Sequence, residues 1–269
     1  MESSYSEYTE HLYKNNFTTL LRQYDNPIIS HQYFIPIETS AKYLKPGSHA
    51  FDWSCGNGHF STFLISKGVT CTGFSFYEIP PHLQEHPSFK FIQGSDNEPT
   101  KLPFDDNYFD FIFSIGVLEH VHETGGDQLR SLNEISRILK QDGLFLCFHL
   151  PNRYSWIEFI CRCLKKLTGN SQKPYAHSRL FTKTKIDQLA ESSRFKLIEW
   201  GRYNFLPRNI TSKLPNAVKT SDNVLRAFNL LDSALVKSLP IFTNQLYFVA
   251  RNNKAQSRQK PGMTSTSTA

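Results

Sequence analysis

The sequence predicts a doubly wound α/β fold, in which a mainly parallel sheet carries helices on both faces. Strand-like and helix-like segments alternate from about residue 49 to residue 250. The segment Phe109–Ile115 is almost continuously apolar, as a parallel strand buried on both faces should be. A turn containing Gly56 and Gly58 directly follows the first of these strands, at the place where such sheets bind ligands.

Each element is expected from its pattern of apolar residues. The expected strands are His49–Trp53, 69–74, 89–92, Phe109–Ile115, 144–150, 195–200 and 245–250. Helices are expected after the first strand, ending at Gly68, and then at residues 127–140, 156–167 and 183–193. Seven strands with interleaved helices indicate a Rossmann-like, doubly wound sheet.

The chain divides into three parts around this sheet. Residues 1–45 carry short helical patterns and are expected to form an N-terminal helical cap, which ends at Pro46-Gly47. Residues 46–251 would form the main domain, with residues 151–181 as a helical insertion after the fifth strand. Residues 252–269 are polar and are expected to be a disordered tail.

Composition narrows the class of protein. A length of 269 residues suits one α/β domain with a modest addition, and a formal net charge of +6 fits either a solvated basic surface or an anionic partner. No run of five basic residues occurs, so specific nucleic-acid binding is not expected. The N-terminus is polar, and no apolar run approaches the roughly 20 residues that span a bilayer, so a cytoplasmic location is expected.

The cysteines give no sign of a disulfide framework or a zinc site. Their number is odd and no CxxC pair occurs, and the set is Cys55, Cys71, Cys147, Cys161 and Cys163. No metal is expected from the sequence.

The glycine turn after the first strand is suited to a ligand. Gly56 and Gly58 allow a tight bend and a close approach, and the next helix directs free N–H groups to the same place. A dinucleotide-binding loop would carry a third glycine where this chain has Ser61. The dinucleotide-binding pattern is therefore incomplete, and an ordinary tight turn between a strand and a helix is the alternative to a ligand-binding loop.

Four segments, in order, resemble the motifs of class I methyltransferases that use S-adenosylmethionine (SAM), of the small-molecule, UbiE/UbiG-like type. They are residues 51–58 (FDWSCGNG), 102–110 (LPFDDNYFD), 115–121 (IGVLEHV) and 134–143 (EISRILKQDG). The resemblance covers about residues 48–150. It implies SAM as cofactor, with a catalytic domain built on the predicted sheet.

The resemblance also implies a set of cofactor-binding positions. Asp52, Gly56 and Gly58 would line the methionine end of SAM, and Ile115 with Gly116 would flank it from the fourth strand. Asp96 follows the third strand, where the family places an acid near the adenine. An exposed turn residue is the alternative role for Asp96.

Two positions depart from the family pattern. Ser54 stands where the family has glycine, and it is expected to fit only with a negative φ. Ser75 stands where an acid binds the ribose hydroxyls, and the loss of one charged hydrogen bond costs about 1.5–3 kcal/mol. Glu78 either replaces that acid or is solvated.

Catalysis by methyl transfer needs an aligned acceptor and, where the acceptor carries a proton, a base. His120 and His149 follow or lie on predicted strands and are the candidate bases, with structural hydrogen bonding as the alternative role of each. Tyr154, Trp156 and His177 in the insertion are candidate substrate contacts. The amphipathic segment 154–167 is expected to act as a lid and to contact a membrane surface, or else to cap the core.

The expected function is methyl transfer from SAM to an O, C or N atom of a small or lipid-like acceptor. The segment Ser114-Ile115-Gly116-Val117 lacks the Asn/Asp-Pro-Pro-aromatic motif of enzymes that methylate DNA bases or protein glutamine. Ser75 supports one alternative, a non-catalytic binding or scaffold protein with this fold. Positive charge alone supports another, an RNA or protein methyltransferase. The oligomeric state stays open.

Overall fold

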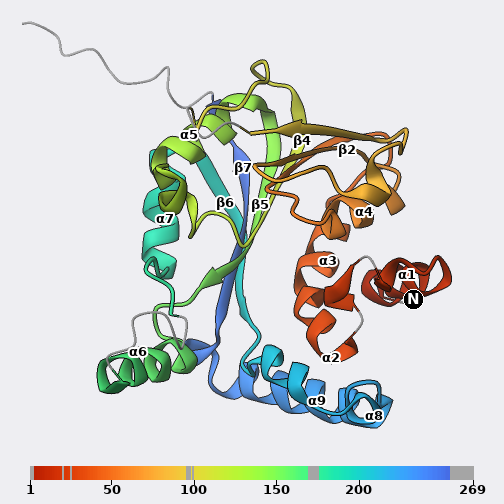
Figure 1. Ribbon diagram of the computed structural model, residues 1–269. Helices are drawn as coiled ribbons and strands as arrows, with labels where there is room; N and C mark the ends of the chain where they lie inside the picture. The colour runs from red at the N-terminus through yellow and green to blue at the C-terminus, as the bar shows by residue number, and fades with distance from the viewer. Residues whose placement is uncertain are drawn as a thin grey trace, which may run out of the picture.

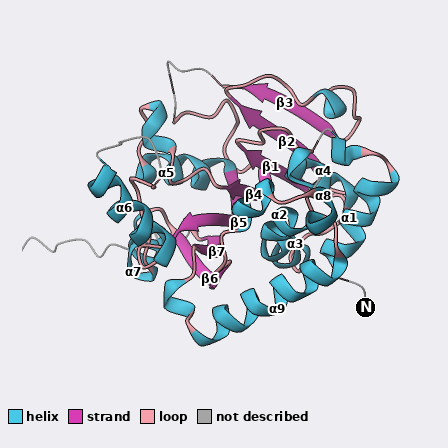
Figure 2. Ribbon diagram, turned by 60° about the horizontal axis from the view of Figure 1, so that its bottom comes forward, coloured by secondary structure: helices cyan, strands magenta, loops and turns pink. Residues whose placement is uncertain are grey.

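The computed structural model of the protein describes residues 3–19, 21–24, 26–94, 98, 100–168 and 176–254. Its centre is a single sheet of seven strands in the order β3-β2-β1-β4-β5-β7-β6, seen edge on in Figure 1 and as one row in Figure 2. The strands are β1 (His49–Trp53), β2 (Thr70–Ser75), β3 (Phe89–Gln93), β4 (Phe109–Ile115), β5 (Leu139–Pro151), β6 (Phe195–Tyr203) and β7 (Gln245–Asn252). The first five run parallel, and β7 is antiparallel to both neighbours. The predicted doubly wound fold is confirmed.

Helices cover both faces of the sheet. On one face lie α5 (Gln128–Ile138) and α7 (Lys183–Ser192), and on the other lie α1 (Ser4–Lys14), α3 (Phe34–Ala41) and α4 (His59–Ser66), as Figure 1 shows. The short helix α2 (Pro27–Ser30) precedes α3. The N-terminal segment thus forms helices against the sheet.

Each face has its own hydrophobic core, because side chains of a strand alternate between the two faces. In β4, Ile112 belongs to the core that contains Leu132 of α5. Its neighbour Phe113 belongs to the other core, where its ring lies 5.2 Å from that of Phe60 in α4. A strand that is apolar on both faces therefore fills two cores at once.

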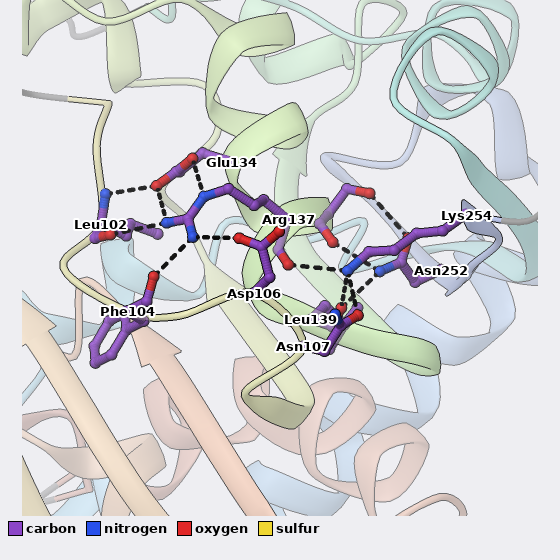
Figure 3. A network of polar contacts seen from close by, with 10 residues as sticks. Leu102, Phe104, Asp106, Asn107, Glu134, Arg137, Leu139, Asn252 and Lys254 are labelled. Atoms are coloured by element: carbon purple, nitrogen blue, oxygen red, sulfur yellow. Dashed lines mark hydrogen bonds and ion pairs between the residues drawn. The ribbon is translucent and has the colours of Figure 1, made fainter. Parts of the chain in front are cut away.

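The junction between α5 and β5 differs from the sequence expectation. The helix ends at Ile138 and β5 begins at once at Leu139, five residues before the predicted start at 144. The side chains of Asn252 and Lys254 donate hydrogen bonds to the carbonyl oxygen of Leu139 (Figure 3). These bonds take up backbone acceptors at the helix end, which favours leaving the helix there.

The same contacts correct the predicted start of the tail. Asn252 is the last residue of β7 and is fully buried, and its amide also donates to the carbonyl oxygen of Ser136. The described fold therefore continues to Lys254, three residues past the predicted boundary at 251. Residues 255–269 lie outside the described residues.

Arg137 connects α5 to the segment that leads into β4 (Figure 3). Its guanidinium donates to the carboxylates of Glu134 and Asp106 and to the carbonyl oxygens of Leu102 and Phe104. Several donors in one plane suit this arrangement of acceptors. The motif segments 102–110 and 134–143 are therefore joined by one arginine.

Two helical additions lie at one end of the sheet. The predicted insertion forms α6 (Trp156–Thr168). A second addition between β6 and β7 contains α8 (Asn216–Lys219) and α9 (Asp222–Ser238), for which the sequence analysis predicts no element. Figure 1 shows α6 and α9 at the same end of the molecule. Within the described residues, no helix has both the length and the apolar character to cross a membrane.

Candidate active site

The carboxyl ends of β1, β2 and β4 meet at one edge of the sheet, and their loops lie side by side. Trp53, the last residue of β1, is in register with Phe74 of β2 and with Ser114 of β4. The backbone N–H of Cys55 donates a 2.9 Å hydrogen bond to the carbonyl oxygen of Phe74. The loop after β1, Ser75 and Ile115 therefore lie in one region.

The two glycines of the loop have different roles. A Cβ atom at Gly58 would lie 2.6 Å from Leu83 Cδ1, so the close packing of this residue requires glycine. At Gly56 a Cβ atom would meet nothing within 4 Å, because this residue borders open space. Gly58 is also the N-cap of α4 and offers no side-chain hydrogen bond, so N–H groups of the first turn can serve a ligand. This loop fits the cofactor that the motifs imply.

Ser54 has a φ of +65°, so the expectation of a negative φ is wrong. The side chain is exposed, and the turn after β1 holds the residue in the left-handed region. The family glycine at this position avoids the steric cost of that conformation, which is about 1–2 kcal/mol for an L-residue. Ser54 therefore adopts a backbone conformation that residues other than glycine disfavour.

Asp52 is buried at the end of β1, and only 2% of its surface is exposed. Ser61 Oγ in α4 donates a 2.6 Å hydrogen bond to Asp52 Oδ2. Burial raises the pKa of Asp52 to about 6, although the hydrogen bond from Ser61 opposes this rise. Asp52 and Ser61 thus join the strand to the helix behind the loop, and contact between Asp52 and SAM stays a prediction.

Ser75 occupies the position at which the family has the acid that binds the ribose. Ser75 is buried, and its Oγ accepts a 3.1 Å hydrogen bond from the backbone N–H of Tyr77. Glu78 is exposed in the following loop, and the ring of Tyr77 is 79% exposed. Asp96 lies outside the described residues. Tyr77, which lies next to the expected ribose contact, was not selected from the sequence.

A cavity of about 430 Å³ lies at the same edge of the sheet, beyond β4 and β5. We call it the histidine pocket, because His120, His149 and His177 all line it. Its other walls are residues 32–33 before α3, Gly116 and Glu119 after β4, Pro151 of β5, Ser155, Ile157 and Glu158 at the start of α6, Asn204 and residues 206–209 after β6, and residues 244–245. The pocket brings together three predicted site histidines from distant parts of the chain.

His149 lies at a bulge in β5 with a φ of +62°. Its Nδ1 lies 2.9 Å from Gln245 Oε1, and the same oxygen accepts a 2.7 Å hydrogen bond from Asn204 Nδ2. This oxygen can only accept, which favours a proton on Nδ1 and a lone pair on Nε2, and Tyr203 Oη lies 3.1 Å from the same Nδ1.

The environment keeps the imidazole of His149 neutral. Burial lowers the pKa of His149 to about 4. Nε2 is buried and has no hydrogen-bond partner among the described residues. The backbone N–H of His149 donates a 2.7 Å hydrogen bond to Tyr203 Oη, which holds the bulge in place. The pocket wall therefore contains a neutral histidine whose Nε2 is buried without a partner among the described residues.

Two carboxylates in the wall were missed by sequence reasoning. Glu119 is only 3% exposed, and burial raises its pKa to about 8. Glu158 is also buried, and its Oε1 lies 2.5 Å from Nδ1 of His177. The signal for Glu119 was its place beside His120 after a buried strand. Glu158 had no signal, because it resembles any charged residue of an amphipathic helix.

Two predicted substrate residues do not line the histidine pocket. Tyr154 is 50% exposed. The indole N–H of Trp156 donates a 2.9 Å hydrogen bond to the carbonyl oxygen of Phe205, and the two rings are stacked. Trp156 therefore connects α6 to the segment after β6. A direct contact of either residue with substrate stays a prediction.

A second hollow, of about 780 Å³, contains Arg137, Arg194 and Lys254 among its lining residues. Arg194 precedes β6, while Arg137 precedes β5. For β5 this is the amino end, opposite to the edge where doubly wound sheets bind their ligands. The histidine pocket is therefore the better candidate for the transfer site.

The strand order, the glycine loop and the adjoining pocket define a class I SAM-dependent methyltransferase, and comparison with known proteins agrees. A model of the methyltransferase domain family matches residues 51–147. The chain belongs to the class I SAM-dependent methyltransferases, with SAM as cofactor.

Among relatives, the chain is similar to demethylmenaquinone methyltransferase of Staphylococcus epidermidis. The two are 34% identical over 59% of this chain and 72% of that protein.

Solved structures with the same fold are more distant. A putative sarcosine dimethylglycine methyltransferase from Galdieria sulphuraria gives a TM-score of 0.56 at 14% identity, covering 84% of this chain and 86% of that one. The 1,6-didemethyltoxoflavin-N1-methyltransferase of Burkholderia thailandensis, solved with S-adenosylhomocysteine, gives 0.52 at 16% identity, covering 93% and 87%. At these identities the likeness concerns the fold alone.

Proposed function

We propose that the protein transfers the methyl group of SAM to a small, lipid-like acceptor bound in the histidine pocket. The observation that carries this proposal is the position of the pocket, whose wall includes Gly116, the residue that follows β4 beside the predicted cofactor loop. A volume of about 430 Å³ suits a small molecule. An acceptor there would lie next to the methyl donor.

SAM supplies a methyl group that is already activated by its positive sulfur. The residues of the chain then have to hold the acceptor in line, exclude water and remove a proton where the acceptor carries one. We assign proton removal to His149 Nε2, because it has no hydrogen-bond partner among the described residues and Gln245 holds the ring at Nδ1. With a pKa of about 4 it is a weak base, which suits an acceptor whose proton is acidic. His120 remains the second candidate for this role.

Exposed apolar side chains near the pocket support a lipid-like acceptor and contact with a membrane surface. On α6, Phe159 is 69% and Leu167 is 83% exposed, and on α9 Leu230 is 72% exposed. Lys165 and Lys166 add positive charge to α6. Apolar and basic side chains together favour an anionic interface. Figure 2 shows α6 and α9 on either side of β6 and β7.

The proposal is tested by binding and turnover. We expect calorimetry to detect S-adenosylhomocysteine binding, and we expect methylation of demethylmenaquinone, the compound for which the relative is named, or of a shorter analogue. His149→Gln should lower kcat at least about 100-fold with little change in S-adenosylhomocysteine affinity, because the base is lost and the cofactor loop is intact.

The exposed residue His11 gives the matched control, and His11→Gln should leave both values unchanged. Absence of binding at millimolar S-adenosylhomocysteine would contradict the proposal and favour a non-catalytic protein with this fold. For the membrane contact, wild type should sediment with anionic vesicles and a Phe159→Ser/Leu167→Ser variant should not. Equal sedimentation of both proteins would argue against the contact.

A further inference from the structure

We propose that Glu119, His120 and His177 bind a divalent transition-metal ion of the Zn²⁺ type in the wall of the histidine pocket. One ligand atom from each of these residues lies within 4.8 Å of the other two. Glu119 and His120 follow β4, whereas His177 follows α6, so the fold brings together two segments that are far apart in sequence. A carboxylate with two imidazoles is a common ligand set for Zn²⁺.

Carboxylates orient both imidazoles for such a role. His120 Nδ1 lies 2.9 Å from Glu123 Oε1, and His177 Nδ1 lies 2.5 Å from Glu158 Oε1. Metal-binding histidines usually have one ring nitrogen held by a carboxylate in this way, which fixes the tautomer and directs the other nitrogen to the ion. The metal would therefore be bound by Nε2 of both rings.

Glu119 supplies an independent observation that points to a cation. Its carboxyl group is 97% buried, since only 3% of the residue is exposed, and Oε2 lacks a hydrogen-bond partner within the described part of the chain. A buried carboxyl oxygen without a partner is unfavourable, and coordination to an ion offsets that cost. Glu119 Oε1 lies 3.9 Å from His120 Nε2.

The spacing needs only a small adjustment to hold an ion. Ligand atoms at about 2.1 Å from a tetrahedral ion are about 3.4 Å apart. The separation of 3.9 Å between Glu119 and His120 is about half an ångström larger, which side-chain rotation can supply. His120 and His177 already have ring centroids only 5.7 Å apart.

Three protein ligands leave a fourth position open, as in catalytic rather than structural zinc sites. Because all three ligands line the histidine pocket, that position would take an oxygen atom of a bound molecule. This part of the inference rests on the proposed function: the acceptor would carry a hydroxyl group, whose pKa the ion would lower. The acceptor class is thereby narrowed to hydroxyl compounds.

The metal alone is the probe for the first test. The whole 269-residue chain is treated with a chelator, dialysed and titrated with Co²⁺, whose visible absorption reports four-coordinate binding by nitrogen and oxygen. We expect one equivalent to bind, Zn²⁺ to displace it, and the ion to raise Tm. The inference would be overturned if the Co²⁺ titration gave no saturating absorption band and the ion left Tm unchanged.

Variants assign the ligands. Glu119→Gln and His177→Gln should each weaken Co²⁺ binding more than about 100-fold, and Glu158→Gln about 10- to 100-fold through the orientation of His177. His11→Gln should bind like wild type. S-adenosylhomocysteine binding by each variant checks that it has folded. Unchanged Co²⁺ affinity in folded Glu119→Gln would overturn the site, while retained cofactor binding would leave the proposed methyl transfer standing.

Discussion

The hydroxyl group of Ser61 and the carboxylate of Asp52 are joined by a 2.6 Å hydrogen bond beneath the cofactor loop. Ser61 occupies the position at which a dinucleotide-binding loop carries its third glycine. Here the Ser61 side chain of α4 contacts Asp52 of β1, whereas a glycine would let the helix approach the strand more closely. The loop is thus supported by a buried acid whose pKa is raised to about 6.

Replacing Ser61 by alanine should make the stability loss depend on pH. The hydrogen bond favours the ionised carboxylate, so its removal should raise the pKa of Asp52 above about 6. The loss should be about 1.5–3 kcal/mol at pH 8, where Asp52 is ionised in wild type, and smaller at pH 5, where it is neutral. Urea unfolding at both pH values measures this. Ser66→Ala in the same helix is the control, and an equal loss at both pH values would contradict the role of Ser61.

Ser54→Gly should stabilise the protein by up to about 1 kcal/mol. The backbone there has a φ of +65°, which glycine adopts without a clash, although glycine also increases the entropy of the unfolded chain. The free energy of unfolding in urea reports the change. The same substitution at Ser221, where φ is −74°, should bring no gain. A lower stability of Ser54→Gly than of wild type would show that the serine side chain compensates its strain.

Ser75→Asp should increase the affinity for S-adenosylhomocysteine about 10- to 100-fold. The substitution restores the charge-assisted contact to ribose that the family obtains from an acid. Ser75 is buried, so a loss of stability from the added charge is also expected. Calorimetry measures the affinity, with Ser75→Asn as the uncharged control of similar shape. No gain in affinity would mean that another residue, such as Glu78, already serves the ribose.

Partly buried histidines should make the fold sensitive to acid. Burial lowers the pKa of His31 and of His59 to about 3, and the charge of Arg208 adds to the effect at His31. In the unfolded chain these groups titrate near 6.5, so stability is retained above pH 6.5 and lost as pH falls towards 3. Each contributes up to about 1.4 kcal/mol per pH unit.

His149, whose pKa burial lowers to about 4, adds to this effect. Asp52 acts in the opposite direction between about pH 6 and 3.8, and Glu119 between about pH 8 and 4.5, because their folded pKa values are raised. The net slope should therefore still be destabilising on acidification. His31→Phe keeps the ring that stacks on Phe34 and removes one titrating group. Urea unfolding between pH 7 and 5 should show a shallower dependence for this variant. An identical slope would mean that His31 does not titrate as its burial implies.

Arg137→Lys should destabilise the fold by about 2 kcal/mol, although charge is conserved. A lysine ammonium cannot reach the carboxylates and carbonyl oxygens that the planar guanidinium contacts together (Figure 3). About one third of the Arg137 side chain is exposed, which limits the loss. Tm should fall by about 4–8 °C. Arg130→Lys in the same helix is the control, and equal Tm values for both variants would contradict the role of Arg137.

Much of the sheet could be predicted from sequence because its signals are local. His49–Trp53 and Phe109–Ile115 have the predicted bounds, since a run of apolar residues between turns defines a short buried strand. The junction at Leu139 was not predictable, because β5 starts where Asn252 and Lys254, more than 100 residues later, bind the end of α5. Local patterns carry no information about such partners.

The second helical addition had weaker signals. In α9, Leu230 and Leu231 are 72% and 54% exposed, so the helix does not present a simple apolar stripe to a core. A buried ion pair between Arg208 and Asp232 fixes it instead, with a separation of 3.1 Å. Two charged residues far apart along the chain give no sign of being a buried pair.

The candidate site was predicted unevenly for the same reason. His120, His149 and His177 could be selected by residue type, and the pocket brings them together. Glu158, which orients His177, and Gln245, which orients His149, belong to other segments of the chain. Their residue types and sequence contexts alone do not predict a place in the site. The left-handed φ of Ser54 was also missed, because a turn can impose a conformation that its residue disfavours.

Much of the wall of the histidine pocket comes from segments outside the sheet, among them residues 32–33 before β1, Ser155, Ile157 and Glu158 after β5, and residues 206–209 after β6, whereas the glycine loop directly follows β1. A graft of these connecting segments from a relative could therefore exchange the choice of acceptor while the methyl donor stays the same. Acceptor choice and cofactor binding would then depend on different segments of the chain.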